Sequence, residues 1–183
     1  MMSPIFAISG LHGSGKSTYA RAIAKAYRLR LVSAGQLFRK LAQEKNMTLE
    51  QFTEEAKNNP QIDRMIDEIT KEEARKGNVV LDGQLSAWMS QDAADVKLFF
   101  TAPDDVRFAR IARRDHVSIE SAKKQTLMRE AVQKERYMRL YGIDPSDLSI
   151  YDVIFDTNLQ SIQKNINILK EILREYMTEK ARK

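Results

Sequence analysis

Short apolar runs recur along the chain, and a segment of helical character follows each of them. The runs have the length of strands: PIFAISG, LRLVSAG, GNVVLDG, DVKLFFTA and YDVIFDT. Apolar residues share one helical face after the first run (Ala20, Ile23, Ala24 and Tyr27) and after the last (Ile162, Ile166, Leu169, Leu173 and Tyr176). Strands that alternate with helices are typical of a parallel sheet covered on both faces. The pattern therefore predicts an α/β fold.

Two segments interrupt this alternation and look like lobes on one core. The first spans about residues 36–76 and holds three helix-length pieces, the second of which opens with Thr48 and Gln51 in the spacing of a capping box. The third piece ends at Gly77, and its apolar face is formed by Ile62, Met65, Ile66 and Ile69. The second lobe spans about residues 115–149 and is rich in arginine and lysine. Such lobes can close over a ligand.

Composition narrows the class of protein. The chain has 183 residues, 43% hydrophobic and 30% charged, which suits a single domain over residues 1–183. No run approaches the roughly 18 apolar residues of a membrane span, and no signal-peptide pattern is present, so we expect a cytoplasmic protein. The absence of cysteine excludes disulfides and zinc–thiolate sites, and two histidines argue against a histidine-rich metal site. The formal net charge of +5 favours anionic partners.

The run SGLHGSGKST lies between the first predicted strand and the first predicted helix. Gly10, Gly15, Lys16 and Ser17 match the pattern G-x-x-x-x-G-K-[ST], the P-loop. Glycines let the backbone curl so that its N–H groups point at phosphate oxygens, and the helix N-terminus adds the positive end of its dipole. Lys16 can then reach the β- and γ-phosphates of a nucleotide, and the Ser17 hydroxyl can ligate Mg²⁺. If this segment were only a glycine-rich turn between a strand and a helix, Lys16 would have no ligand to bind.

We therefore predict that this loop binds the phosphates of ATP together with Mg²⁺. The predicted ATP-binding residues of the loop are Gly10, Leu11, His12, Gly13, Ser14, Gly15, Lys16, Ser17 and Thr18. His12 is expected to be a neutral filler, because a P-loop acts through its backbone amides. The motif identifies the phosphoryl donor and leaves the acceptor open, since GTPases, helicases and small-molecule kinases share it.

Two further residues follow predicted strands. Asp82 stands at the carboxyl end of the third strand, where ligands bind in open parallel sheets, and its carboxylate could hold Mg²⁺ directly or through water. It could instead cap the next helix. Arg39 lies about one turn into the helix after the second strand, and its planar guanidinium suits a second phosphate. Ser17 and Asp82 are thus the predicted metal ligands.

The second half of the chain carries regularly spaced arginines. Arg107, Arg110, Arg113 and Arg114 recur at helical spacings, and Arg129 and Arg136 stand two turns apart on the next predicted helix. A solvated helix face is the ordinary explanation for such charge. Arginines carried by a closing lobe would also neutralise the charge of a phosphoryl group in transfer and exclude water. A phosphate acceptor fits best, because its oxygens are already ionised and need no general base.

Together these motifs resemble the nucleoside monophosphate kinases. The stretches SAGQLFR, NPQIDRMID and RYMRLYGIDPSDLSIYDVIFDT are similar to the short, archaeal-type cytidylate kinases, over nearly the whole chain. The resemblance implies a P-loop NTPase-like, five-stranded parallel sheet flanked by helices, with a monophosphate-binding lobe at about 36–76 and a lid at about 115–149. It implies transfer of the γ-phosphoryl group of Mg-ATP to CMP or dCMP, giving ADP and CDP or dCDP.

The resemblance also implies roles for single residues. Lys16, Arg114, Arg129 and Arg136 would be the catalytic residues, with Arg114 on the ATP phosphates and Arg129 and Arg136 clamping the phosphates during transfer. Arg110 would pack against the ATP base. The acceptor would be bound by Ser33, Arg39, Asp63, Arg64, Asp82, Gly83 and Gln84.

Within the acceptor set, two assignments stay open and one departs from the family pattern. Asp63 is a plausible reader of the cytosine amino group, because a carboxylate accepts from that donor, whereas Arg64 can only donate, which suits the base carbonyl or a phosphate. After LDG the family commonly has an arginine that contacts the acceptor phosphate, and this chain has Gln84. A glutamine supplies no charge, so a neighbour compensates or acceptor affinity is lower. Trp88 is expected to be a packing residue.

The residues named above also fit other functions. A kinase for AMP or UMP would share nearly every residue above, and a kinase for a phosphate-free acceptor would need a carboxylate base. A P-loop NTPase associated with RNA would account for the basic charge, but the arginine segments lack the interleaved aromatic residues on which single-stranded nucleic acids stack. We expect ATP and CMP or dCMP as ligands, a monomer, and no stable nucleic-acid or membrane partner.

Overall fold

Five parallel strands form one sheet in the order β2-β3-β1-β4-β5 in the computed structural model, which describes residues 4–180. The strands are β1 Ile5–Gly10, β2 Arg30–Ser33, β3 Val79–Asp82, β4 Val96–Thr101 and β5 Val153–Asp156. All five predicted strands are confirmed. The central strand β1 pairs with β3 and β4, so the P-loop that follows it emerges in the middle of the carboxyl edge of the sheet.

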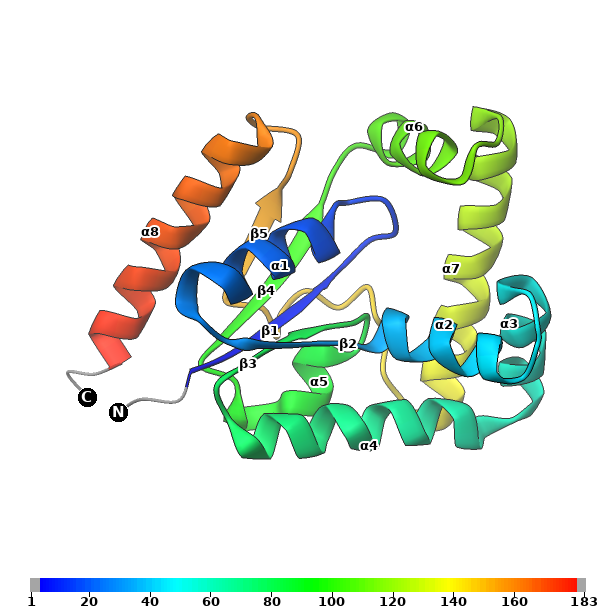
Figure 1. Ribbon diagram of the computed structural model, residues 1–183, viewed down its shortest axis with the longest axis horizontal. Coiled ribbons are helices and arrows are strands. Elements are labelled where there is room, and N and C mark those ends of the chain that lie inside the picture. The colour runs from blue at the N-terminus through cyan, green and yellow to red at the C-terminus, as the bar shows by residue number, and fades with distance from the viewer. Residues whose placement is uncertain (1–3, 181–183) are drawn as a thin grey trace.

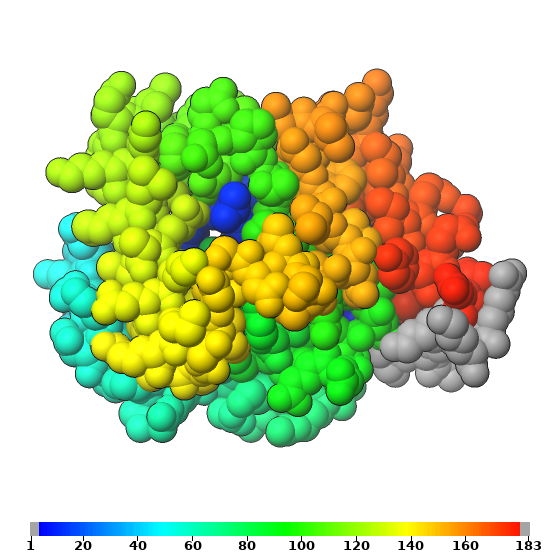
Figure 2. Space-filling view, turned by 180° about the vertical axis from the view of Figure 1, so that it is seen from behind, coloured from blue at the N-terminus to red at the C-terminus, as the bar shows by residue number. Residues whose placement is uncertain are grey.

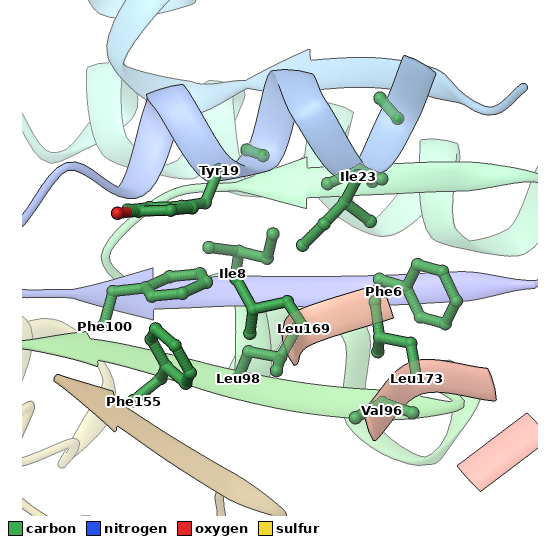
Figure 3. Packing of buried hydrophobic residues seen from close by; sticks show 13 residues of the cluster. Phe6, Ile8, Tyr19, Ile23, Val96, Leu98, Phe100, Phe155, Leu169 and Leu173 are labelled. Atoms are coloured by element: carbon green, nitrogen blue, oxygen red, sulfur yellow. The ribbon is translucent and has the colours of Figure 1, made fainter. Parts of the chain in front are cut away.

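Helices cover both faces of the sheet, as the alternation predicts (Figure 1). On one face, α1 (Lys16–Tyr27) and α8 (Ile162–Lys180) pack on alternate strand residues such as Phe6 and Ile8 (Figure 3). On the other face, α4 (Pro60–Lys76) packs through Ala74 on Ile5, Val79 and Leu81, beside α5 (Ser86–Ser90) and the short 3₁₀ helix η1 (Gln91–Ala93). The alternation of side chains along each strand thus divides the core in two.

The first predicted lobe consists of α2 (Ala34–Glu44), α3 (Leu49–Asn58) and α4, and has an apolar cluster of its own. Thr48 and Gln51 form the predicted capping box at the start of α3, and Gly77 caps α4 with a φ of 66°. The predicted apolar face of α4 is partly wrong, because Met65 is 44% exposed. The buried stripe of α4 runs instead through Ile62, Asp63, Ile66, Asp67, Thr70 and Ala74. Carboxylates therefore occupy core-facing positions that an apolar pattern cannot reveal.

The arginine-rich region folds as α6 (Asp104–Asp115) followed by α7 (Ile119–Tyr141), one continuous helix of 23 residues. In Figure 1, α7 runs from α6 down to the lobe formed by α2, α3 and α4. Residues 142–152 return to β5 without a helix or strand. Among residues 4–180, no helix is long and apolar enough to cross a membrane.

Candidate active site

The loop between β1 and α1 has the geometry that its glycines predict. Gly10 has a φ of 146°, and a Cβ at this position would lie 2.1 Å from the Phe100 carbonyl oxygen of β4. Gly13 has a φ of 78°, and its Cβ would lie 2.6 Å from the backbone oxygen of Arg107. Both positions therefore require glycine for conformation and for space. Because α1 begins at Lys16, the first N–H groups of that helix face out of its N-terminus, where an anion binds well.

Asp82 connects the P-loop to the predicted acceptor pocket. Its Oδ2 accepts hydrogen bonds from the hydroxyls of Ser17 (2.8 Å) and Ser33 (3.0 Å), and the residue is 3% exposed. The carboxylate stands at the end of β3, between the ends of β1 and β2, as predicted. A hydroxyl and a carboxylate at this distance are suitable donors for Mg²⁺ that keeps water and phosphate ligands. Among the residues described, no group of three or more His, Asp or Glu side chains could hold a metal by itself.

Positive charge gathers around Lys16. Burial lowers the pKa of the Lys16 ammonium, Asp82 and Glu130 oppose this effect, and Arg129 and Arg114 strengthen it. Burial also lowers the pKa of Arg129, and Arg114, Arg39 and Arg136 lower it further. The arginines predicted from α2, α6 and α7 are therefore within electrostatic reach of one another. An anionic ligand would relieve their repulsion.

Asp63 and Arg136 are brought together by α4 and α7. Arg136 Nε lies 2.7 Å from Asp63 Oδ2, and the two side chains are only 4% and 8% exposed. Burial raises the pKa of Asp63 even though Arg136 opposes it. One turn further along α4, Asp67 accepts a hydrogen bond from Tyr141. Arg64 lies between these carboxylates in sequence and is exposed.

The other predicted residues lie around the same edge of the sheet. Arg110 donates to Thr157 Oγ1 (2.9 Å) after β5, next to the Ser14 carbonyl. Arg39 is exposed on α2, and Arg114 is exposed and paired with Asp115. Gly83 lies in close contact with α2, because a Cβ there would lie 2.8 Å from Ala34 Cβ. Trp88 packs against Tyr151 with ring centroids 5.6 Å apart, which confirms its packing role.

Sequence reasoning missed the residues that hold the P-loop in place. Arg107 is 2% exposed and donates to the His12 carbonyl oxygen (2.7 Å) and to Glu130 of α7 (2.8 Å). Gln133 of α7 lies 2.7 Å from the His12 imidazole. The contacts to His12 join positions roughly a hundred residues apart, and Arg107 and Glu130 are 23 residues apart, so no local pattern signals them. Viewed from behind, the molecule has a hollow between α6, α7 and the segment near residue 150, with residues from the start of the chain at its floor (Figure 2).

Comparisons with known proteins agree with this geometry. A family model described as the cytidylate kinase-like family matches residues 5–159. A cytidylate kinase of Staphylothermus marinus is 45% identical over 96% of this chain and 99% of that protein. A cytidylate kinase of Methanopyrus kandleri is 39% identical over 92% of this chain and 92% of that protein.

Solved structures confirm the fold at much lower identity. A shikimate kinase from Bacteroides thetaiotaomicron has a TM-score of 0.62 at 15% identity, covering 93% of this chain and 98% of that chain. An uncharacterized protein from Eubacterium ventriosum has a TM-score of 0.71 at 17% identity, with the same coverage of 93% and 98%. The predicted P-loop fold is therefore confirmed. Since the family model spans most of the chain and the relatives match nearly all of it, this chain belongs to the cytidylate kinase-like family.

Proposed function

We propose that the protein is a cytidylate kinase, which transfers the γ-phosphoryl group of ATP to CMP or dCMP. The observation that carries the proposal is the P-loop with its Ser17–Asp82 hydrogen bond, next to which Arg114 of α6 and Arg129 of α7 act on the buried Lys16. Such an arrangement suits the transfer of a phosphoryl group between two polyanions. The relatives named cytidylate kinase support cytidylate as the acceptor.

The donor side of the reaction would be organised by the P-loop. Its backbone amides and the N-terminus of α1 would hold the donor phosphates, and Lys16 would contact the β- and γ-oxygens. Ser17 and Asp82 would hold Mg²⁺, which would supply positive charge to the donor phosphates. Arg114 would bind the ATP phosphates, Arg110 would pack against the base, and Arg129 and Arg136 would stabilise the charge that spreads over the transferred group.

The acceptor side would be organised by the ends of β2 and β3. Arg39 and Gln84 would bind the acceptor phosphate, and Ser33 and Gly83 would border the nucleoside. Gln84 contributes no charge, and the nearby cluster of arginines around Arg129 would compensate. Asp63 would accept from the cytosine amino group and Arg64 would donate to the base or phosphate.

The same proposal extends to the organisation of the molecule. The chain would be one domain with a monophosphate-binding lobe at about residues 36–76 and a lid at about residues 115–149, and it would act as a monomer in the cytoplasm. Structures with and without ligands test the lid. Unchanged positions of residues 115–149 would contradict it.

The first experiment measures ADP formation from Mg-ATP with CMP, dCMP, UMP, AMP and GMP offered separately. We expect CMP and dCMP to be turned over best, and Lys16→Ala to lower kcat/KM at least about 100-fold. Lys25→Ala, an exposed lysine on the same helix, is the matched control and should resemble the wild type. If another monophosphate is turned over instead, the residues proposed to bind phosphates would keep their roles. Asp63 and Arg64 would then not be the residues that recognise cytosine. Salt-dependent RNA binding without monophosphate turnover would favour the RNA-associated alternative.

A further inference from the structure

His12 is the residue through which α7 contacts the P-loop. Its backbone N–H donates to Glu130 Oε1 (3.2 Å), and its carbonyl oxygen accepts from Arg107 Nη1 (2.7 Å). The same Arg107 nitrogen donates to Glu130 Oε1 (2.8 Å), which closes a ring of polar contacts. Both backbone groups of one P-loop residue are thus held by a single ion pair.

The His12 side chain adds a second connection to the same helix. Its Nε2 lies 2.7 Å from Gln133 Oε1 and 3.2 Å from Gln84 Nε2, so it can donate to the first or accept from the second. Burial holds the pKa of His12 well below its usual range, with Arg129, Lys16 and Arg107 adding to the effect. The imidazole is therefore neutral, as the sequence analysis expected, but it connects three segments of the site rather than filling space.

These contacts matter because they lie close to Arg129 on α7. Other anchors of the helix, such as Arg136 with Asp63 and Tyr141 with Asp67, lie about two turns or more further towards its C-terminus. Its buried residues are Ala122, Thr126, Arg136 and Tyr137. Arg129 is adjacent to Glu130, and its Nε is buried without a hydrogen-bond partner. Among residues 4–180, no hydrogen bond therefore fixes the Nε of this guanidinium. The position of Arg129 relative to Lys16 depends on where the helix backbone is held, and Glu130 holds it one residue away.

We propose that Glu130 is a positioning residue for phosphoryl transfer, which fixes α7 on the P-loop through Arg107 and His12 and so sets the distance between Arg129 and the donor phosphates. This inference rests on the proposed kinase function. A positioning error of about 1 Å can lower a rate about 100-fold, so a contact that makes no approach to substrate can still control the chemistry.

Glu130 also contributes charge to the site. The titratable and charged groups near Lys16 come from the P-loop, β3, α6 and α7: the neutral His12, and the charged Asp82, Arg114, Arg129 and Glu130. Of these only Asp82 and Glu130 favour the protonated ammonium. Glu130 therefore offsets part of the positive charge around Lys16.

Three variants separate charge, contact and general effects of mutation. Glu130→Gln keeps an oxygen that accepts from His12 and Arg107 but removes the charge, whereas Glu130→Ala removes both. Glu135→Gln makes the same chemical change at an exposed position of α7 and is the control. Trp88, the only tryptophan, packs beside Tyr137 of α7, so its emission and the thermal unfolding midpoint show whether the helix stays folded and docked.

For Glu130→Ala we expect kcat to fall about 10- to 100-fold with little change in KM for the monophosphate. For Glu130→Gln, which keeps the accepting oxygen, we expect most of kcat to be recovered, again with little change in KM. Glu135→Gln should match the wild type in both measurements. Unchanged kcat in Glu130→Ala would overturn the proposal. So would a loss of kcat in Glu130→Ala that is accompanied by altered Trp88 emission and is not recovered in Glu130→Gln.

Binding of Mg-ATP without any acceptor distinguishes this proposal from the proposed function. A fluorescent ATP analogue should bind less tightly to Glu130→Ala than to the wild type, whichever monophosphate is phosphorylated, because Arg129 would no longer be held near the donor phosphates. If the wild type turns over no monophosphate, the kinase proposal fails, and the claim that Glu130 positions a transfer step fails with it. If the wild type is active and the variants match it, only the role of Glu130 is wrong.

Discussion

Asp67 lies on the buried side of α4, where its Oδ2 accepts a hydrogen bond of 2.5 Å from the Tyr141 hydroxyl. Burial raises the pKa of this carboxyl to about 6 from 3.8, while the bond from Tyr141 opposes the change and Asp63 adds to it. Because the folded-state pKa lies above the unfolded value, the folded protein binds this proton more readily. Stability should therefore rise as pH falls through about 6, with the gain complete below about 3.8.

Replacing this carboxyl by an amide tests the argument. Asp67→Asn keeps an acceptor for Tyr141 and should raise the free energy of unfolding by about 2 kcal/mol near pH 8. The advantage should shrink as pH is lowered through about 6 and disappear near pH 4. Urea unfolding across this range measures it, with the exposed Glu72→Gln on the same helix as control. If the difference in unfolding free energy between Asp67→Asn and the wild type does not change with pH, the burial of an ionised Asp67 does not destabilise the protein.

Individual residues differ in how far the sequence predicts them. Gly10, Lys16 and Ser17 are recognisable because a short motif encodes a complete local structure, and Thr48 with Gln51 for the same reason. Glu130 was missed, because its partners His12 and Arg107 lie 118 and 23 residues away and its immediate neighbours give no hint of them. Local chemistry is thus readable from the sequence, whereas the contacts that position it are not.

At the scale of elements, the start of α8 is tied to the P-loop by one buried amide. Asn165 is fully buried, and its Nδ2 donates to the Tyr19 hydroxyl of α1 (3.0 Å) and to the carbonyl oxygens of Thr157 (3.0 Å) and Gln160 (3.2 Å). Thr157 Oγ1 in turn donates to the Ser14 carbonyl (2.7 Å). Helix α8 therefore supports the P-loop through Asn165 and Thr157.

Asn165→Asp should disrupt this junction. The change replaces a donor by a charged acceptor that faces three oxygens, so we expect the free energy of unfolding to fall by about 3 kcal/mol at neutral pH. Chemical denaturation measures the loss. Asn167→Asp, an exposed position half a turn away, should change stability by less than about 0.5 kcal/mol. Equal effects at the two positions would show that the hydrogen bonds of Asn165 contribute nothing.

Elements also show where a periodic pattern fails. The five strands and the helices after them were predicted because each buries a continuous apolar set, as Phe6 and Ile8 do on β1. The face of α4 was partly misjudged, since Asp63 and Asp67 take core-facing positions and Met65 does not. Helix α7 was predicted only from the spacing of its arginines, and the contacts that it makes through Glu130 and Gln133 were missed because they are polar. Amphipathic patterns report apolar packing and nothing else.

At the scale of the whole molecule, the arginines gathered at the site should lower the stability of the protein without ligand, although they serve its activity. Arg129 is surrounded by Arg114, Arg39 and Arg136, and burial and these neighbours lower its pKa. Its Nε is buried without a hydrogen-bond partner. Such an arrangement costs folding free energy when no anion is bound, and proteins commonly accept this cost at sites that bind charged ligands.

Arg129→Met should therefore make the protein without ligand more stable while it abolishes turnover. Methionine fills a similar volume without a charge, so we expect the free energy of unfolding to rise by about 1 kcal/mol, or a few degrees in the unfolding midpoint. The exposed Arg113→Met on α6 should change neither stability nor activity. Mg-ATP at about 100 times its Kd should stabilise the wild type by about 2.7 kcal/mol and Arg129→Met by less. If Arg129→Met is less stable than the wild type without ligand, Arg129 supports the fold. The loss of turnover could then not be attributed to a missing contact between Arg129 and the transferred phosphoryl group.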